Sequence, residues 1–360
     1  MSDVRYWLGF NLIAGVGPVR FRRLLGHFGS AEQAWRASAL ELGRAGLDAR
    51  LAEQVVLRRA QIDLEAECER AERCQTNLVT LDDPRYPSLL KHVSDSPPLL
   101  YVRGILESGD ELALGVVGTR RASVYGKQVC ERIVAEVAGR GVTIVSGLAR
   151  GIDAVAHRVA LSSGGRTIAV LGSGVDVIYP AEHRNLAAEI AHNGAVVSEY
   201  PLGTQPDAGN FPPRNRIISG MSRAVLVVEA GETSGALITA TYAGDQGRDV
   251  LAVPGSILAP GCVGTNRLIQ QGAKLVQDVN DVLDELNVQT VGQQLAFRAL
   301  TPEDPVERSL LDILTGEPVH VDEIVRKVGL PTATVSGALA MLELKGMARH
   351  VGGMSYVIGK

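Results

Sequence analysis

The sequence predicts an α/β protein whose core is a mainly parallel β-sheet. Short apolar runs alternate with helical patterns from about residue 110 onward, which favours βαβ units with right-handed crossovers. Glycine accounts for 40 of the 360 residues, and many glycines stand where an apolar run ends and a helical pattern begins. Apolar residues make up 46% of the chain and aromatic residues 4%, a balance typical of a core built from Val, Ile, Leu and Ala.

The first 75 or so residues are predicted to be helical. The stretch LGFNLIAGVGPVRFRRLLGHFG holds a glycine turn at 15–17 between two apolar-periodic segments, which predicts a helix-hairpin-helix, or SAM-like, region. Such a hairpin either binds a DNA backbone through its turn amides, helped by Arg20, Arg22 and Arg23, or is purely architectural. One long amphipathic helix from about 48 to 74 should follow as a packing helix.

Seven strands are predicted in the central region, and helical patterns separate nearly all of them. They lie near residues 112–117, 142–145, 167–171, 195–199, 224–229, 249–253 and 274–277. This order predicts a Rossmann-like domain over 79–288, after a helical hairpin domain over 1–78. A proline-rich passage, DDPRYPSLL and then SPPLLYVRG, leads into the sheet as extended chain and turns.

The C-terminal part is predicted to be a winged-helix domain over 306–360. A Gln-rich linker at 289–305 precedes three helical segments, and two strands surround the glycine pair at 352–353. The third helix carries almost no basic residue at its start, which argues against readout of double-stranded DNA. A protein-contact or packing role suits this domain at least as well.

Composition and charge exclude several classes of protein. No apolar run approaches the roughly 20 residues that cross a bilayer, and no signal-peptide pattern is present, so we expect a cytoplasmic protein with no membrane contact. The four cysteines have no metal-ligand spacing, so neither a metal site nor a disulfide framework is predicted. The net charge of −4 argues against a broadly basic surface but leaves room for a local basic groove.

Six glycine-rich turns follow the predicted strands. In a parallel sheet such turns share one edge, where helix N-termini direct backbone N–H groups outward and favour phosphate. Arginines in these turns can add bidentate contacts to a phosphate. The candidate nucleic-acid-binding residues in these turns are Gly118, Thr119, Arg120, Arg121, Ser146, Gly147, Arg150, Gly151, Ser234 and Gly235.

The passage FPPRNR is the strongest candidate for nucleic-acid contact. A loop stiffened by prolines places Phe211 three residues before the first of two guanidiniums, with Asn215 between them. Single-strand sites combine aromatic faces for bases with cations for phosphates. We therefore expect Phe211 to stack on a base and Arg214 and Arg216 to meet phosphates.

Structural alternatives stay open for several of these residues. Phe211 is alternatively a core residue, and one of the two arginines alternatively pairs with Glu199 or Glu229 to brace the loop. Asp153 and His157 lie four positions apart on one helix face. An acidic residue in the first turn stabilises a helix dipole, so a structural role is preferred for this pair over acid–base catalysis.

Seven motifs in order closely resemble the DNA-processing protein A family, DprA or Smf: GVVGTRRASVYG, IVSGLARGIDAVAH, IAVLGSGVDVIYP, VVSEYPLG, FPPRNRIISGMS, VVEAGETSGALITA and VLAVPGS. The resemblance covers essentially the whole chain and is strongest from about 84 to 280. It implies a Rossmann-like domain that binds single-stranded DNA, forms homodimers and helps load the RecA recombinase during natural transformation. We predict a binding protein with no cofactor and no enzymatic activity.

Three other functional classes fit the sequence less well. A nicotinamide dehydrogenase needs closely spaced glycines after the first strand, where this chain has GTRRASVYG. The central domain is also similar to LOG-type phosphoribohydrolases, but Ile238 and Thr239 lie about where their catalytic glutamate would sit, and Glu232 precedes the turn. A double-stranded DNA regulator would act through the winged helix, whose nearly neutral third helix argues against it.

Overall fold

The computed structural model describes residues 4–288, 304–314, 318–344 and 347–358. The chain forms two compact units, Met1–Val288 and Gln289–Lys360. The linker predicted at 289–305 lies outside the described residues except for its last two positions, and the boundary predicted near residue 78 stays a prediction. Across the described residues, no helix is both long enough and apolar enough to cross a membrane.

All seven predicted strands are present, and the Rossmann-like fold is confirmed. Within the described part of the chain they belong to a nine-stranded sheet with the order β1-β2-β6-β5-β4-β3-β7-β8-β9. Strands β3 to β9 pair in parallel with one another. These strands are β3 (Ala113–Val117), β4 (Thr143–Ser146), β5 (Thr167–Val170), β6 (Ala195–Ser198), β7 (Ala224–Val227), β8 (Asp249–Ala252) and β9 (Lys274–Leu275).

Two strands that were not predicted extend the sheet. β1 (Asn77–Thr80) pairs antiparallel with β2 (Leu99–Gly104), which pairs antiparallel with β6. The prolines around residues 84–98 hid them, because the short helix α7 (Ser88–Lys91) and turns fill that passage. β3 lies between β4 and β7, so the chain leaves the centre of the sheet in opposite directions. Ligands of open α/β sheets bind at the carboxyl ends of strands at such a switch point.

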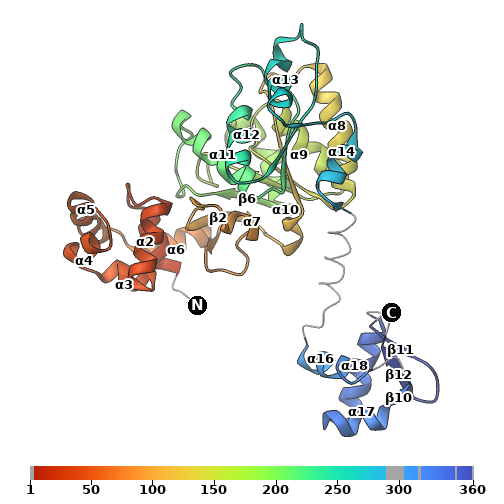
Figure 1. Ribbon diagram of the computed structural model, residues 1–360. Coiled ribbons are helices and arrows are strands. Elements are labelled where there is room, and N and C mark those ends of the chain that lie inside the picture. The colour runs from red at the N-terminus through yellow and green to blue at the C-terminus, as the bar shows by residue number, and fades with distance from the viewer. Residues whose placement is uncertain (1–3, 289–303, 315–317, 345–346, 359–360) are drawn as a thin grey trace. The chain divides into compact units, whose positions relative to one another are not determined.

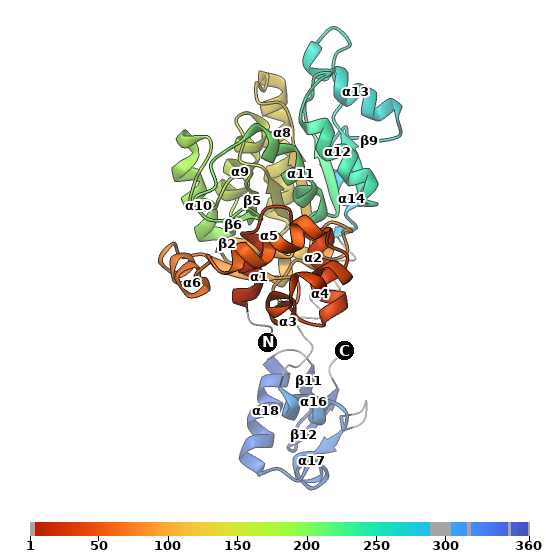
Figure 2. The same ribbon diagram turned by 90° about the vertical axis from the view of Figure 1, so that its left-hand side faces the viewer.

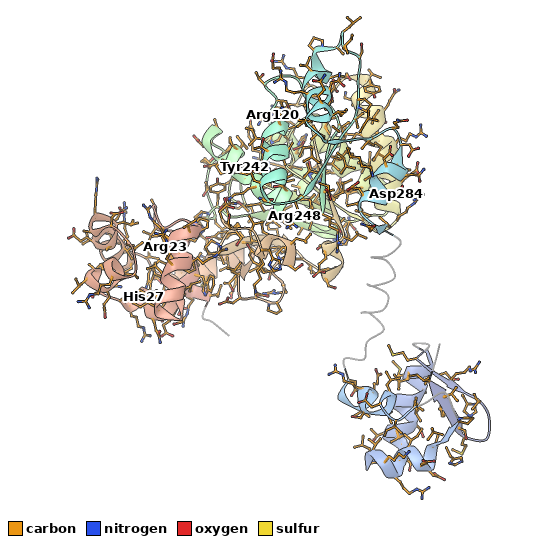
Figure 3. All side chains as sticks on the ribbon, in the orientation of Figure 1. Arg23, His27, Arg120, Tyr242, Arg248 and Asp284 are labelled. Carbon is orange, nitrogen blue, oxygen red and sulfur yellow. The ribbon has the colours of Figure 1, made fainter. Side chains whose placement is uncertain are left out.

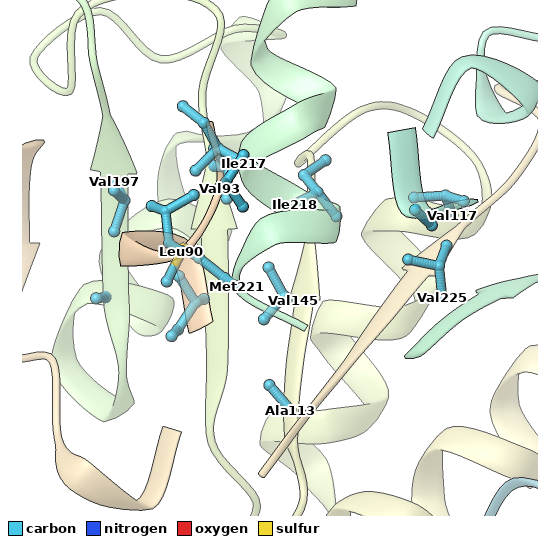
Figure 4. Packing of buried hydrophobic residues seen from close by; sticks show 14 of the residues in the cluster. Leu90, Val93, Ala113, Val117, Val145, Val197, Ile217, Ile218, Met221 and Val225 are labelled. Carbon is cyan, nitrogen blue, oxygen red and sulfur yellow. The ribbon is translucent and has the colours of Figure 1, made fainter. Parts of the chain in front are cut away.

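Helices cover both faces of the sheet (Figures 1 and 2). One face packs against α7, α11 and α12, and the other against α9 and α10. Figure 4 shows Ile217 and Ile218 of α11 gathered with Val145, Val117 and Val225 of the strands. The α-helices of this region are α8 (Val124–Gly139), α9 (Ile152–Ser162), α10 (Arg184–Asn193), α11 (Phe211–Gly220), α12 (Ala236–Asp245), α13 (Val263–Gln270) and α14 (Val279–Glu285). The 3₁₀ turns are η1 (Ser108–Glu111), η2 (Ala181–His183), η3 (Ala208–Asn210) and η4 (Pro260–Cys262).

The N-terminal helices form their own aromatic core. Trp7 and Phe10 of the first helix contact Phe21 of the second, and Trp35 packs edge-on against Phe10. The predicted single helix over 48–74 is wrong, because the side chain of Asp63 accepts from the Ala66 amide and caps a new helix. The helices are α1 (Val4–Asn11), α2 (Pro18–Phe28), α3 (Ala31–Arg36), α4 (Ala39–Arg44), α5 (Ala49–Arg59) and α6 (Leu64–Arg73).

The second unit is a winged helix, as predicted. Among its described residues, the helices α16 (Pro305–Leu311), α17 (Val321–Val328) and α18 (Thr332–Leu344) pack around a small apolar core. The strands form a sheet with the order β10-β12-β11. They are β10 (Val319–His320), β11 (Ala348–His350) and β12 (Ser355–Ile358), of which β10 was not predicted.

Candidate nucleic-acid interface

A cavity of about 790 Å³ opens at the carboxyl edge of the sheet, where the chain leaves β3, β4 and β7. We call it the edge pocket. Its walls come from the turn after β3, Ala149, the start of α11 and the turn before α12. Sequence-distant glycine turns therefore meet at one place, as a parallel sheet requires. The predicted residues that line it are Gly118, Thr119, Arg120, Arg121, Phe211, Arg214, Asn215, Ser234 and Gly235.

An arginine and two aromatic rings form one wall of the edge pocket. The guanidinium carbon of Arg120 lies 5.5 Å from the centroid of the Phe211 ring, a cation–π distance. The ring of Tyr179 lies 5.7 Å from that of Phe211, with 37° between their planes. Tyr179 is 40% exposed and Phe211 is half-buried. Sequence reasoning missed Tyr179, although an aromatic residue before proline in IAVLGSGVDVIYP was a signal.

Phe211 stands at the start of a helix and not in a loop. It is the first residue of α11, and proline follows in the first turn, where its missing N–H costs no helical hydrogen bond. A Cβ at Gly172 would lie 2.8 Å from the Phe211 ring, so the glycine turn after β5 lets the ring pack closely on the backbone. One side of the ring is thus supported by protein.

Arg120 and Arg121 provide the accessible positive charge of the edge pocket. Both are exposed, and among the described residues neither forms an ion pair. Figure 3 places Arg120 in the sheet region, apart from Arg23 and His27 of the N-terminal helices. The one carboxylate among the lining residues is that of Asp153, which is buried. An anionic ligand therefore meets guanidinium groups before it meets any acid.

Internal hydrogen bonds hold the turn after β3, which corrects the prediction that the backbone amide of Thr119 contacts phosphate. The Thr119 amide donates to the Glu229 carbonyl oxygen at 2.7 Å, and its hydroxyl accepts from the Arg121 amide at 3.2 Å. The Thr119 amide is therefore not available to a phosphate. A Cβ at Gly118 would lie 2.5 Å from Ile152 of α9, so glycine here permits close packing of the turn on that helix.

Arg214 lines the edge pocket but is bonded to the protein backbone. The side chain is buried, and its guanidinium donates to the carbonyl oxygens of Gly147, at 2.8 Å, and of Val170. Burial lowers the pKa of Arg214 to about 10, while the nearby Asp153 carboxylate favours its charged form. The predicted phosphate contact of Arg214 is not seen in this conformation, because the side chain is buried and its Nη1 joins the backbone at the ends of β4 and β5.

Arg216 lies away from the edge pocket and does not meet phosphate. Its Nη2 lies 2.7 Å from Oε2 of Glu199, and its Nε lies 3.1 Å from Oδ2 of Asp95. The bracing alternative with Glu199 is therefore confirmed. Glu229 takes another role, because its carboxylate accepts from the amide and hydroxyl of Ser123 at 2.9 and 3.0 Å.

The turn after β4 mainly contributes structure, although Gly147 and Arg150 line a smaller cavity together with Arg120 and Phe211. The Ser146 hydroxyl is buried and donates to the Val116 carbonyl oxygen at 2.6 Å, so the predicted phosphate contact of Ser146 is wrong. Gly147 is also buried, and a Cβ there would lie 2.7 Å from the Arg214 guanidinium. Gly151 has φ of 78° and approaches the Thr119 carbonyl closely. Arg150 is exposed but pairs with Glu182 at 2.6 Å.

Asp153 and His157 are structural, as expected. The Asp153 carboxylate accepts from the amides of Gly147 and Ala149 at 3.2 and 3.4 Å. His157 is fully buried, and its Nδ1 lies 2.7 Å from the Thr167 hydroxyl. Burial lowers the pKa of His157 to about 3, so the ring is neutral at neutral pH. Asp153 thus holds the turn after β4 and His157 is bonded to β5, and only Asp153 lines the edge pocket.

The hydrolase alternative lacks a carboxylate at the position where its catalytic glutamate is expected, at the start of α12. Ile238 and Thr239 line the edge pocket, whereas Glu232 pairs with Arg267 at 2.7 Å outside the lining residues.

Asn215 lines the pocket, and its Nδ2 lies 3.3 Å from the Gly235 carbonyl oxygen. The described residues contain no cluster of three or more side chains that could hold a metal ion.

Comparisons with known proteins agree along the whole chain. The family model of DNA recombination-mediator protein A matches residues 77–287, and that of the DprA winged helix domain matches residues 295–354. Protein Smf of Synechocystis sp. is 37% identical over 392 aligned residues, which cover 99% of this chain and 98% of that protein. Protein Smf of Escherichia coli is 42% identical, over 77% of this chain and 76% of that protein.

Solved structures give the same result. The X-ray structure of DNA processing protein A from Streptococcus pneumoniae superposes with a TM-score of 0.71 at 36% identity, covering 79% of this chain and 99% of that one. The DNA processing protein A of Helicobacter pylori, which has a single-stranded DNA binding mode, superposes with a TM-score of 0.52 at 29% identity. That match covers 61% of this chain and 97% of that one.

Proposed function

Because this chain belongs to the DNA recombination-mediator protein A family, the DprA or Smf proteins, we propose that it binds single-stranded DNA in the edge pocket. The arrangement of Arg120 over the Phe211 ring, with Tyr179 beside it, is the observation that carries the proposal. It joins a cation to aromatic faces, the two elements that single-strand sites share. The Helicobacter pylori relative with its single-stranded DNA binding mode supports the same ligand class.

Each group has a role in this proposal. Arg120 and Arg121 contact successive phosphates, because their guanidiniums are exposed at the mouth of the pocket. Bases stack on the exposed surfaces of Phe211 and Tyr179, each stacked base contributing about 1–3 kcal/mol. The small residues at Ser234 and Gly235 leave room for the backbone of the strand.

The binding mode favours an unpaired strand over a duplex. Stacking on Phe211 requires a base face, and base faces are covered by neighbouring bases inside a double helix. The ring also lies inside the pocket wall and not on a projecting element that could enter a groove. Binding of single strands should therefore be much tighter than binding of duplex DNA.

Family membership extends the proposal beyond the pocket. We place the protein in the cytoplasm, as a homodimer formed through the sheet region that passes its bound strand to the RecA recombinase. It carries out no turnover chemistry of its own in this proposal. Stimulation of RecA-dependent ATP hydrolysis on protein-coated single strands would support the handover, and unchanged hydrolysis would contradict it.

Fluorescence anisotropy with labelled oligonucleotides tests the binding function. Single-stranded DNA, duplex DNA and RNA of equal length are titrated with the full chain at several salt concentrations. We expect the tightest binding for single-stranded DNA, with affinity falling as salt rises. Equal binding of duplex, or release of ribose 5-phosphate from a nucleoside monophosphate, would contradict the proposal in favour of a duplex binder or a hydrolase.

A further inference from the structure

Helix α11 has two functional faces. Phe211, Arg214, Asn215 and Ile218 line the edge pocket at helical spacing. Arg216 stands five positions after Phe211, about 140° around the helix axis from it. A Cβ at Gly220 would lie 2.6 Å from Leu90, so the back of the helix also packs tightly on α7. Helix α11, which carries Phe211, is thus packed against α7 on the side away from the edge pocket.

We infer that Arg216, Asp95 and Glu199 form a brace through which the N-terminal helices position Phe211 for stacking. We call these three residues the α11 brace. The inference rests on the proposed function, since it concerns how the same site is held. Arg216 is a positioning residue in it and touches no nucleic acid.

The α11 brace is anchored at both ends in the N-terminal helices. The Arg22 guanidinium of α2 donates to the Ser94 carbonyl oxygen at 2.6 Å and to the Ser96 hydroxyl at 2.7 Å, on either side of Asp95. Asn11 of α1 donates to the Glu199 carbonyl oxygen at 3.1 Å. Two N-terminal helices therefore contact the two segments whose carboxylates pair with Arg216.

A second route joins Glu199 to the ring. Tyr200 follows Glu199, and its hydroxyl donates to the Asn210 carbonyl oxygen at 3.3 Å. Asn210 directly precedes Phe211 at the start of α11. A shift of the segment that carries Glu199 would thus reach α11 both at its start, through Asn210, and at its middle, through Arg216.

Stability alone does not explain this network. Arg216 is 6% exposed, and burial raises the pKa of Glu199 while Arg216 opposes that rise. Within the described part of the chain, Glu199 Oε1 and Arg216 Nη1 are buried without a hydrogen-bond partner. A buried ion pair with unmet polar atoms gains little over apolar packing, and such pairs are better suited to fixing one geometry.

Two of the three arginines of the N-terminal hairpin, Arg20 and Arg22, make hydrogen bonds within the protein, whereas Arg23 is exposed. Arg20 donates to the Gly15 carbonyl oxygen at 2.8 Å, which closes the glycine turn. Arg22 is engaged with the segment around Asp95. The architectural alternative for the hairpin therefore accounts for both arginines, and the hairpin acts on DNA binding through α11.

A double-mutant cycle in the full chain tests the brace. Asp95→Asn and Arg22→Gln are made alone and together with Phe211→Ala, and binding of a single strand containing 2-aminopurine is measured by anisotropy and by base fluorescence. Arg216 itself is left intact, because removing one partner of a buried pair can unfold a protein. Asp83→Asn is the matched control, since it breaks an ion pair with Arg85 in the same passage, away from α11.

The brace predicts coupling with the ring. Each of Asp95→Asn and Arg22→Gln should weaken binding about three- to tenfold, a part of the stacking contribution of one base. Each should also reduce the fluorescence change of the stacked base, and neither should weaken binding further once Phe211 is alanine. Asp83→Asn should bind like the parent protein.

Several results would overturn the inference. Parental binding by both brace variants would do so, as would equal weakening with and without the Phe211 ring. If Phe211→Ala binds like the parent while Asp95→Asn binds weakly, the brace acts on something other than the ring and the inference fails. If Phe211→Ala and Arg120→Ala both bind like the parent, the proposed function itself fails at this site.

Discussion

Arginines in neighbouring motifs have opposite roles in this molecule. Arg120 lies in the tight turn after β3, and its side chain projects over the Phe211 ring. Arg214 lies near the start of α11, and its side chain points inward and donates to backbone carbonyl oxygens. Residue type alone does not separate an accessible cation from a buried one. The local path of the backbone decides which of them meets solvent.

Replacing Arg120 by alanine should weaken single-strand binding and lower its salt dependence. Each phosphate contact contributes about 0.7 to the slope of log affinity against log salt for single strands, so the slope should fall by about that amount. Titrations at several salt concentrations measure it. Arg132→Ala is the control, because Arg132 is exposed on α8 outside the edge pocket. An unchanged slope for Arg120→Ala would show that this guanidinium meets no phosphate.

Replacing Phe211 by alanine should weaken binding by about 1–3 kcal/mol and leave the salt slope nearly unchanged. The reason is that stacking releases no counterions, whereas phosphate contacts do. Tyr179→Ala should behave in the same way with a smaller loss, because Tyr179 is the more exposed ring. Thermal melting of both variants confirms folding. A lower slope for Phe211→Ala would mean that the ring mainly supports Arg120.

His157 should make the first unit less stable in mild acid. Its pKa in the folded chain is about 3, below the ordinary 6.5, so the unfolded chain takes up a proton that the folded chain refuses. Stability is full above pH 6.5 and falls as pH drops towards 3, by about 1 kcal/mol between pH 6.5 and 5.5 from this group. His157→Asn, which retains a polar atom near the Nδ1 position, should lose that dependence.

Urea unfolding at pH 7.5, 6.5 and 5.5 measures this effect. Tryptophan fluorescence reports the first unit, because Trp7 and Trp35 are the two tryptophans of the chain. His92→Gln serves as the control, since His92 is exposed. Parallel pH dependence in the parent protein and His157→Asn would show that the buried ring does not stay neutral.

At the scale of elements, the glycines of the turns allow strands and helices to pack closely against one another. Gly118 lies against Ile152, and a methyl group there would overlap a buried side chain. Gly118→Ala should therefore destabilise the first unit by about 1–3 kcal/mol, the usual cost of overpacking. Gly139→Ala, at the end of α8 with no atom within 4 Å, should be neutral or slightly stabilising. Equal melting temperatures for the two variants would contradict this account.

The alternation of elements was predictable because strands and helices have different periods. Apolar runs bounded by glycine located β3 to β9, and the shared edge of a parallel sheet then brought Gly118, Phe211 and Ser234 to one pocket. β1 and β2 were hidden by prolines in the segment between them. The break between α5 and α6 was missed because Asp63 reads equally well as a surface residue of one helix and as a cap of the next.

The site was only partly predictable because the sequence does not show which polar side chains are buried. A sequence does not reveal that Ser146 ends a central strand with its hydroxyl on Val116, or that Arg216 faces away from Phe211. The pairing of Arg216 with Glu199 was foreseeable only as one of several charge pairs. Tyr179 escaped because its role depends on a ring 32 positions later in the chain.

For the whole molecule, accessible positive charge gathers at the edge pocket, although the chain is acidic overall. The chain carries a net charge of −4, yet the edge pocket presents Arg120 and Arg121 with Asp153 buried behind them. This charge distribution attracts anions at one place and does not favour nucleic acid over the whole surface. The winged-helix element α18, in contrast, has the sequence TATVSGALAMLEL and carries no Lys or Arg. The first unit should therefore carry the main contact with a single strand.

Photo-crosslinking tests this claim most directly. The full chain is irradiated with a single-stranded oligonucleotide that contains 5-iododeoxyuridine, and the crosslinked residues are identified by mass spectrometry. The account predicts crosslinks at Phe211 and Tyr179, with fewer in the Arg120→Ala variant. Crosslinks confined to the helical hairpin or to residues 304–358, and unchanged by Arg120→Ala, would contradict it.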